Sequence, residues 1–416
     1  MSRTPSATGD ERLYTLRFFK VFGGVVLFMT GVALQFHFGQ YIQHLGHGVD
    51  TLGMVLGISM VGTLLIRLHI GRWIDRFGCR PIWVVGAMAA TLGAGAIQFT
   101  GHLWLIVLLR ALTTMAAAAV MTTVAVIAAH VAPPRRRAES LGSMGLGGFT
   151  GMIIGATLGD YIFSAPIETI LPYRVFFSTS AACSLLSGTV LLLIALPAGC
   201  GPAGSHGDVT AGPGPAGPST LRVICTHWPG TVLLVGLVFS MVFCLQTSFL
   251  ERLAEARGFY NIKAFFLTYG PTAIILRIVF RRVPERIGRT RSVVGGMLLL
   301  GTGVALLTGV QTQWGLIAPA LLMGAGHCFV FPSMVDLAAE RLPADRRGTG
   351  TSLILAAGDL GMLTGFVGLG EVIDRLGYDA ALWALVAAVL TAAIVFGVSR
   401  RDAVLGRTRR AAVGHP

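Results

Sequence analysis

The fold of this chain is decided around residues 67–81, whose sequence is RLHIGRWIDRFGCRP. The stretch is a short basic turn with one carboxylate, Asp75, and it stands between two long apolar runs. A weaker copy, RIVFRRVPERIGR, returns 210 positions later at residues 277–289. Two copies of one turn, each between long apolar segments, indicate a chain built from two related halves.

The composition of the chain indicates a membrane protein. Of its 416 residues 54% are hydrophobic and 12% are charged, and this charged share is about half that of a soluble domain. The net charge of +13 comes from short basic clusters between apolar runs, as anchoring charges do, which argues against nucleic-acid binding. The six cysteines show no metal or redox spacing, so we expect no metal and no cofactor.

Twelve apolar runs are long enough to cross a bilayer, for which a helix needs about 20 residues. They lie at 18–43, 51–71, 81–100, 103–131, 138–165, 173–196, 230–253, 261–281, 291–310, 313–339, 347–372 and 379–398. Half of the residues in 197–220 are glycine or proline, which is typical of a flexible tether. We therefore predict an all-α membrane protein with a cytoplasmic tail, a six-helix bundle, a cytoplasmic linker, a second six-helix bundle and a basic cytoplasmic tail, at 1–17, 18–196, 197–229, 230–399 and 400–416.

The distribution of basic residues predicts the orientation. Most of the 32 lysines and arginines lie in the two termini and in the loops that follow even-numbered spans. Because cytoplasmic loops carry the excess of lysine and arginine, both termini are expected in the cytoplasm, with the chain as a multi-pass protein of the cell membrane.

The offset of 210 residues returns at further positions without a gap. The matched pairs are Gly48 and Gly258, Arg67 and Arg277, Gly78 and Gly288, Gly86 and Gly296, Pro133 and Pro343, Arg137 and Arg347, Gly151 and Gly361, and Gly155 and Gly365. One register at so many positions predicts two six-helix halves of the same architecture.

The turn resembles the signature of the major facilitator superfamily, Gly-x-x-x-Asp-Arg-x-Gly-Arg-Arg, between the second and third helices. The residues that carry the resemblance are Gly71, Asp75, Arg76, Gly78 and Arg80 in the first copy and Glu285, Arg286, Gly288 and Arg289 in the second, where Glu285 replaces the aspartate. The resemblance implies two pseudo-symmetric halves with a substrate site between them at mid-membrane. It also implies that the turn latches the cytoplasmic side in the outward-facing state. The alternative is a set of basic residues that only fixes topology.

The chemistry of the turn is suited to such a latch. Gly71 would let two helices approach closely, and Gly78 suits the left-handed bend that ends a helix. Asp75 can accept hydrogen bonds from the first amides of a neighbouring helix. Arg76 and Arg80 can pair with Asp75 or with lipid phosphate.

Two glycine pairs predict close helix packing in the fifth and eleventh spans. Gly151 and Gly155 resemble a weakened form of the motif Gly-x-x-x-Gly-Pro of antiporters, with Ala156 in place of the proline. Gly361 and Gly365 repeat the spacing. The alternative is packing with no bearing on the direction of transport.

Polar and titratable residues inside the spans are costly and predict a cavity or a partner. The expected cavity and coupling residues are Gln35, His37, Arg110, Gln246, Thr247, His327 and Asp359. Asp359 lies roughly 18 Å into its span, near mid-membrane, and is the expected proton carrier. If Arg110 shares the cavity with Asp359, it would favour the ionised form of this carboxylate. His37 and His327 are the substitute carriers, and Arg67 is expected to extend to the cytoplasmic interface. The alternative for each is a polar side chain satisfied by a neighbouring helix.

The sequence therefore predicts a secondary transporter that moves a small organic solute by alternating access, and not an enzyme. No phosphate-binding loop for direct ATP drive is present. Residues 248–258 and 324–332 resemble the bacterial sugar- and drug-efflux permeases, which implies export coupled to protons. The expected partners are a small-molecule substrate, protons and the lipid bilayer, with the chain as a monomer. The alternatives are facilitated uptake or symport of an organic acid or sugar, and a membrane scaffold or sensor that does not transport.

Overall fold

The computed structural model describes residues 14–131, 136–163, 169–194, 200, 226, 228–259, 261–280, 283–343 and 347–413. These residues form helices and turns and include no strand. The expected N-terminal tail and linker lie for the most part outside these ranges. At the other end, the last helix continues through residue 400 to Val413, so the backbone of the expected C-terminal tail is largely helical.

The first half of the chain forms six spans. The first is a broken helix made of α1 (Leu16–Leu34), η1 (Gln35–His37) and α2 (Phe38–His44). The others are α3 (Val49–Phe77), α4 (Cys79–Ile97), α5 (Leu103–Val131), α6 (Arg137–Ile162) and α7 (Leu171–Leu192).

The second half repeats this order. Its first span is also broken, into α9 (Thr231–Cys244), the π-helical turn η4 (Leu245–Phe249) and α10 (Leu250–Ala256). It continues with α11 (Lys263–Val279), the short α12 (Val283–Ile287), α13 (Arg289–Leu307), η5 (Gln313–Leu316), α14 (Ile317–Ala339), α15 (Arg347–Leu376) and α16 (Tyr378–Val413). Both halves therefore interrupt their first span at the same depth.

Eleven helical segments of the described chain are long and apolar enough to cross a membrane. The remaining expected span, 261–281, is α11, which has 17 residues and contains Pro271. Seventeen residues are the lower end of the length that crosses the hydrocarbon core. The predicted all-α fold with twelve spans is confirmed, and its eighth span is short.

The packing of glycines shows that the halves are built alike. A Cβ placed on Gly86 would lie 2.8 Å from Val120, and one on Gly296 would lie 2.7 Å from Val330, so α4 meets α5 as α13 meets α14. Both residues of one contact are displaced by 210 from those of the other. The repeat read from the sequence is therefore a repeat of helix contacts.

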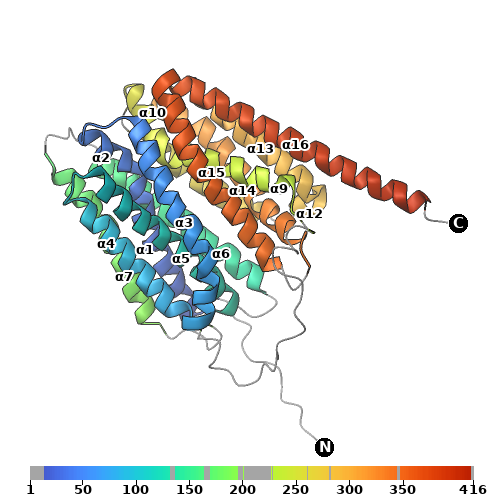
Figure 1. Cartoon of the computed structure of the whole chain (residues 1–416), viewed down its shortest axis with the longest axis horizontal. Helices are drawn as coiled ribbons and strands as arrows, with labels where there is room; N and C mark the ends of the chain where they lie inside the picture. Colours follow the sequence, from blue (N-terminus) through green and yellow to red (C-terminus); the bar gives the residue numbers. More distant parts are fainter. Residues whose placement is uncertain are drawn as a thin grey trace, which may run out of the picture.

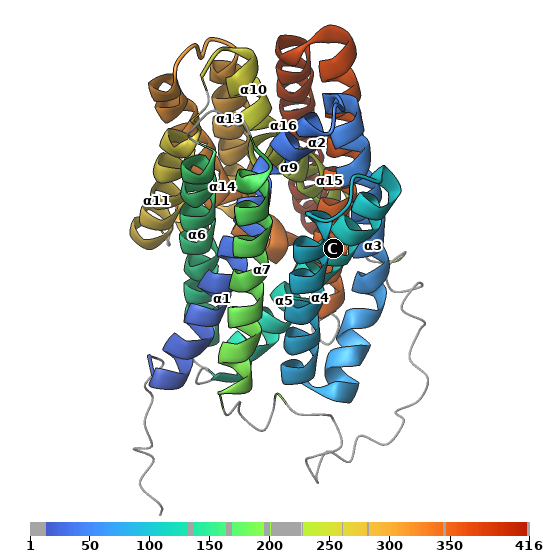
Figure 2. The same cartoon turned by 90° about the vertical axis from the view of Figure 1, so that its left-hand side faces the viewer.

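The two halves meet along two helix pairs and at one end of the bundle. Helix α3 packs along α15, and α6 packs along α11. At the end that carries α2 and α10, η1 and α2 contact η4 and α10. Figures 1 and 2 show the two halves side by side, with α2 and α10 together at one end of the bundle and the start of α1 at the other. We call these ends the α2/α10 face and the basic face, the latter carrying the turns at Gly78 and Gly288.

Candidate functional site

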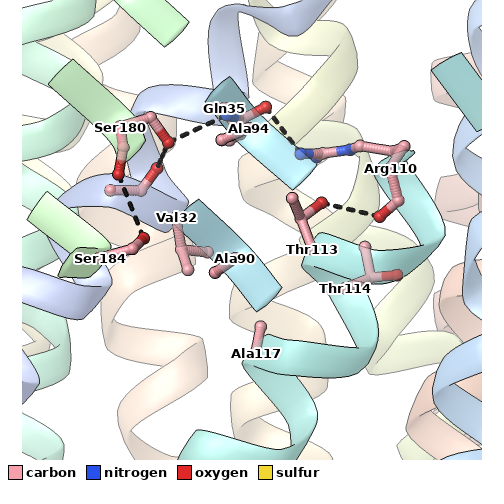
Figure 3. Close-up of a pocket in the computed structure, with 11 residues that line it drawn as sticks. Val32, Gln35, Ala90, Ala94, Arg110, Thr113, Thr114, Ala117, Ser180 and Ser184 are labelled. Atoms are coloured by element: carbon pink, nitrogen blue, oxygen red, sulfur yellow. Dashed lines mark hydrogen bonds between the residues drawn. The ribbon is translucent and has the colours of Figure 1, made fainter. Parts of the chain in front are cut away.

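A polar pocket lies within the first half, around Arg110 on α5 (Figure 3). Arg110 Nη1 donates to Oε1 of Gln35 at 2.8 Å, and Gln35 Nε2 donates to Oγ of Ser180 at 3.0 Å. The Arg110 guanidinium also lies 5.0 Å from the centre of the Phe38 ring. The cavity has a volume of about 50 Å³, which holds a few water molecules rather than an organic solute. Arg110 and Gln35 thus contact each other, in a site of the first half that is closed in this conformation.

A second polar group lies in the other half, around His327 on α14. Gln246 Nε2 donates to the Tyr269 hydroxyl at 3.0 Å, and this hydroxyl is 2.5 Å from Nδ1 of His327. Four phenylalanine rings have their centres within 4.9–6.0 Å of the imidazole: Phe149, Phe239, Phe243 and Phe331. Phe149 belongs to α6 of the first half, so the aromatic surround of His327 includes both halves. Thr247 is satisfied within its own helix, where it donates to the Phe243 carbonyl at 2.8 Å.

The α2/α10 face is closed by a buried cluster of titratable groups. His37 on η1 lies with its Nε2 3.1 Å from Oδ1 of Asp160 on α6 and 3.6 Å from Oε1 of Glu251 on α10. His37 is 1% exposed, and each of the two carboxylates is 4% exposed. Gln40 Nε2 also donates to Glu251 at 2.7 Å. We call His37, Asp160 and Glu251 the titratable cluster.

The titratable cluster joins the two halves through charge. Asp160 Oδ1 accepts a hydrogen bond from the Ile262 amide of the second half at 3.2 Å, while Glu251 of the second half faces His37 of the first. His37 Nδ1, Asp160 Oδ2 and Glu251 Oε2 are buried without a hydrogen-bond partner among the described residues. Buried polar atoms without partners are costly, and buried charges more so. Within the described chain these groups are not arranged as metal ligands.

Asp359 is held by a different arginine from the one expected. Arg67 on α3 donates from Nε and Nη2 to the carboxylate of Asp359 on α15, the second bond at 2.9 Å. The expectation that Arg67 extends to the interface was wrong, because α3 and α15 pack side by side and leave Arg67 and Asp359 facing each other. Arg110, which was considered as a neighbour of Asp359, donates to Gln35 instead.

The basic turn lies at the basic face with its aspartate exposed. Asp75 has no hydrogen bond or ion pair with any residue that the structure describes. Gly78 and Gly288 have φ of 83° and 91°, a left-handed conformation that favours glycine. A Cβ at Gly71 would meet no described atom within 4 Å, so the expected close helix approach there is absent from this conformation.

The basic side chains of the two turns have separate partners. Arg76 lies over the Phe77 ring at 5.3 Å, and Arg80 donates to the Ile194 carbonyl. Arg289 forms an ion pair with Glu340, and Arg286 is exposed. The side chain of Glu285 lies outside the described part of the chain.

The four packing glycines lie against the broken helices of their own halves. A Cβ on Gly151 would come within 2.6 Å of the Val26 carbonyl of α1, and Gly155 lies against the Thr30 carbonyl. Gly361 and Gly365 meet α9 in the same way, at the Leu237 carbonyl and at Met241. The spacing therefore places backbone against backbone in both halves.

Glu251 and Asp160 were not among the cavity and coupling residues expected from the sequence. One signal was present, since both lie within the expected apolar runs 230–253 and 138–165. Their proximity to His37 could not be read from the sequence because the three residues come from three helices in two halves.

Comparisons with known proteins agree with this architecture. The model of the Major Facilitator Superfamily matches residues 21–284 and 262–413. The chain is 25% identical over 376 residues to an uncharacterized MFS-type transporter of Salmonella typhimurium, covering 85% of this chain and 89% of that protein. It is 22% identical over 378 residues to the multidrug resistance protein MdtH of Aeromonas hydrophila, covering 90% of this chain and 88% of that protein.

Solved structures show the same fold. The peptide transporter POT superposes with a TM-score of 0.74 at 14% identity, covering 92% of this chain and 94% of that chain. The nucleoside transporter NupG gives a TM-score of 0.73 at 12% identity, covering 91% of this chain and 98% of that chain. At these identities the likeness establishes the arrangement of helices.

Proposed function

Because this chain belongs to the major facilitator superfamily, we propose that it exports a small organic solute in exchange for protons. The two halves alternate in exposing a site between them, and this conformation is the one closed at the α2/α10 face. Export is favoured by the similarity to a protein named for multidrug resistance. The basic face is assigned to the cytoplasm because of the positive charge that it carries.

One observation carries the proton coupling: three titratable groups from both halves are buried together where the halves close. When the halves part at the α2/α10 face, Glu251 separates from His37 and water reaches all three side chains. When the halves close, the same groups are removed from water, and the free energy needed to bury their net charge rises. A proton taken from the α2/α10 side lowers the net negative charge of two carboxylates and one imidazole, so proton binding and closure favour each other.

The charged neighbours of the cluster form a pair of their own. Arg252 Nη1 donates to Oε2 of Glu255 at 2.6 Å on the same helix, α10, and Arg252 also reaches Gln43 of α2. Arg252 is therefore already neutralised by Glu255 and does not remove the need for a proton in the cluster.

The exposed Asp75 supports the same assignment of the conformation. In the family this turn latches the cytoplasmic side when the opposite side is open. Here the α2/α10 face is closed and Asp75 has no partner in the described chain, which is the arrangement of a released latch.

The proposal is tested in proteoliposomes with an imposed pH gradient. The probes are radiolabelled p-toluenesulfonate and phenyltrimethylammonium, two aromatic ions of similar size whose charges do not change with pH. We expect wild-type protein to accumulate one of them against its gradient, and Glu251→Gln to lose accumulation while keeping downhill exchange. Glu255→Gln is the matched control on the same helix and retains accumulation.

Two results would count against the proposal. Unchanged pH-driven accumulation in Glu251→Gln, His37→Gln and Asp160→Asn would remove the coupling role of the cluster. A downhill flux of the probes that is the same with and without the pH gradient, in wild-type protein, would favour facilitated diffusion.

The orientation is tested by labelling intact cells with a membrane-impermeant maleimide, in a variant without native cysteines. His102, between α4 and α5, and Arg341, after α14, are exposed and lie at opposite faces. A cysteine at position 102 is expected to react and one at 341 to remain unlabelled. The reverse labelling pattern would place the basic face outside the cell, and the proposed direction of transport would change from export to uptake.

A further inference from the structure

The pseudo-symmetry of the two halves leaves one half-buried arginine without a counterion among the residues that the structure describes. Arg67 and Arg277 occupy the same position in the two halves, 210 residues apart. The partner of Arg67 is Asp359, and the residue 210 positions before Asp359 is Phe149. The helix pair α3 and α15 thus carries a complete ion pair, while its counterpart, α11 and α6, carries the arginine and a phenylalanine.

Arg277 is directed to the place where its partner would be. A Cβ on Gly145 of α6 would lie 3.7 Å from Nη1 of Arg277, one helical turn from Phe149. On the same face of α11, Gly270 packs against Phe149 and Ile153. The guanidinium therefore lies between the halves and is half-buried.

No described side chain neutralises this guanidinium. Arg277 makes no hydrogen bond or ion pair within the part of the chain that the structure describes. On α6 the charged residues lie at the two ends: Glu139 with Arg136 at the basic face, and Asp160 in the titratable cluster. A cation placed between membrane helices without a partner marks a ligand or ion pathway.

Aromatic side chains form an apolar surface on the α2/α10 side of Arg277. Phe149 lies 5.2 Å from His327, ring centre to ring centre, and Phe239 and Phe331 lie beside the same imidazole. These rings can cover a flat apolar body, and a guanidinium binds a carboxylate or sulfonate through paired hydrogen bonds.

We infer that Arg277 binds the anionic group of an aromatic organic anion, which takes the place that Asp359 holds in the other half. This inference rests on the proposed transport function and names its substrate class. Arg277 lies on the basic-face side of the aromatic rings, where a solute entering from the cytoplasm would arrive first. The ligand would complete the second ion pair between the halves only while it is bound.

The test measures equilibrium binding of p-toluenesulfonate and of phenyltrimethylammonium to the purified full-length protein. We expect saturable binding of the anion only, weakened about ten-fold or more in Arg277→Gln, which removes charged hydrogen bonds, and less in Arg277→Lys. Binding of the cation instead, or of neither ion, overturns the inference.

Two substitutions at one position of α6 distinguish an effect of charge on anion binding from an effect on folding. Phe149→Asp supplies the missing carboxylate and is expected to abolish anion binding, whereas Phe149→Asn removes the same ring and leaves Arg277 free. Equal anion binding in these two variants, both eluting as a single species, would show that Arg277 is not the site. Inorganic phosphate serves as a competitor: displacement of p-toluenesulfonate only by p-toluenesulfonate itself and by benzoate supports an aromatic ligand, and equal displacement by phosphate contradicts it.

The outcome for transport is read separately. Arg277-dependent binding without pH-driven accumulation would support the anion site and contradict proton-coupled export. Accumulation of phenyltrimethylammonium alone would support proton-coupled export and contradict the anion site.

Discussion

Arg67 on α3 and Asp359 on α15 form an ion pair across the two halves of the molecule, although they are 292 residues apart in the chain. Asp359 is 7% exposed, so the pair lies largely out of contact with solvent. The Arg67 guanidinium donates two hydrogen bonds to the Asp359 carboxylate, so this pair links α3 to α15 in this conformation. The proton-carrying role that the sequence favoured for Asp359 is therefore better suited to the titratable cluster at the α2/α10 face.

The first prediction concerns this pair. Asp359→Asn and Arg67→Gln each leave an uncompensated charge and are expected to lower the thermal unfolding midpoint of the purified protein. Arg67→Met combined with Asp359→Leu removes both charges and should lie closer to wild type than either single variant. Asp359→Asn should retain pH-driven accumulation. Additive losses of stability in the double variant would contradict a direct pairing.

The second prediction concerns the latch. Asp75→Asn is expected to slow transport about two- to five-fold, because an anion at a helix end contributes about 0.3–1 kcal/mol. Its thermal midpoint should match wild type, since Asp75 is exposed in this conformation. The initial flux is measured at equal protein content. Wild-type flux would leave the turn with a role in topology alone.

The third prediction concerns helix packing. Gly155→Ala places a methyl group against the Thr30 carbonyl of α1 and within 2.8 Å of Ala33, and is expected to cost about 1–3 kcal/mol. Gly148→Ala, two turns earlier on the same helix, meets nothing within 4 Å and serves as the control. Thermal unfolding in detergent compares the two. Equal midpoints would show that α1 and α6 separate easily.

The fourth prediction concerns pH. Spin labels at His102 and Lys263, exposed in different halves near the α2/α10 face, report the separation there. Lowering the pH from about 8 to about 6 adds protons to the cluster, reduces its net negative charge and makes its burial less costly. The distance distribution should shift toward the closed form. Glu251→Gln should lose most of this shift, and a shift in the opposite direction would contradict the coupling scheme.

The order of elements was predictable because it depends on local composition. Apolar length predicted the spans, and the basic turns predicted the family, since lipid excludes charge wherever it occurs along the chain. The glycine pairs were predictable as packing sites for the same local reason. Glu251 was missed because the seventh span is interrupted at η4 and continues as α10, and the sequence does not show that α10 buries this carboxylate against the first half.

The sequence by itself determined the membrane fold, the two halves and their register of 210 residues, because hydrophobic length and repeated motifs are properties of the chain. Only the tertiary structure decided which charges meet. Asp359 pairs with Arg67 rather than Arg110, His37 faces two carboxylates, and Arg277 faces none of the described carboxylates. These relationships join helices from different halves, and the energy of a charge depends on its distance from other charges and from water. No local pattern encodes those distances.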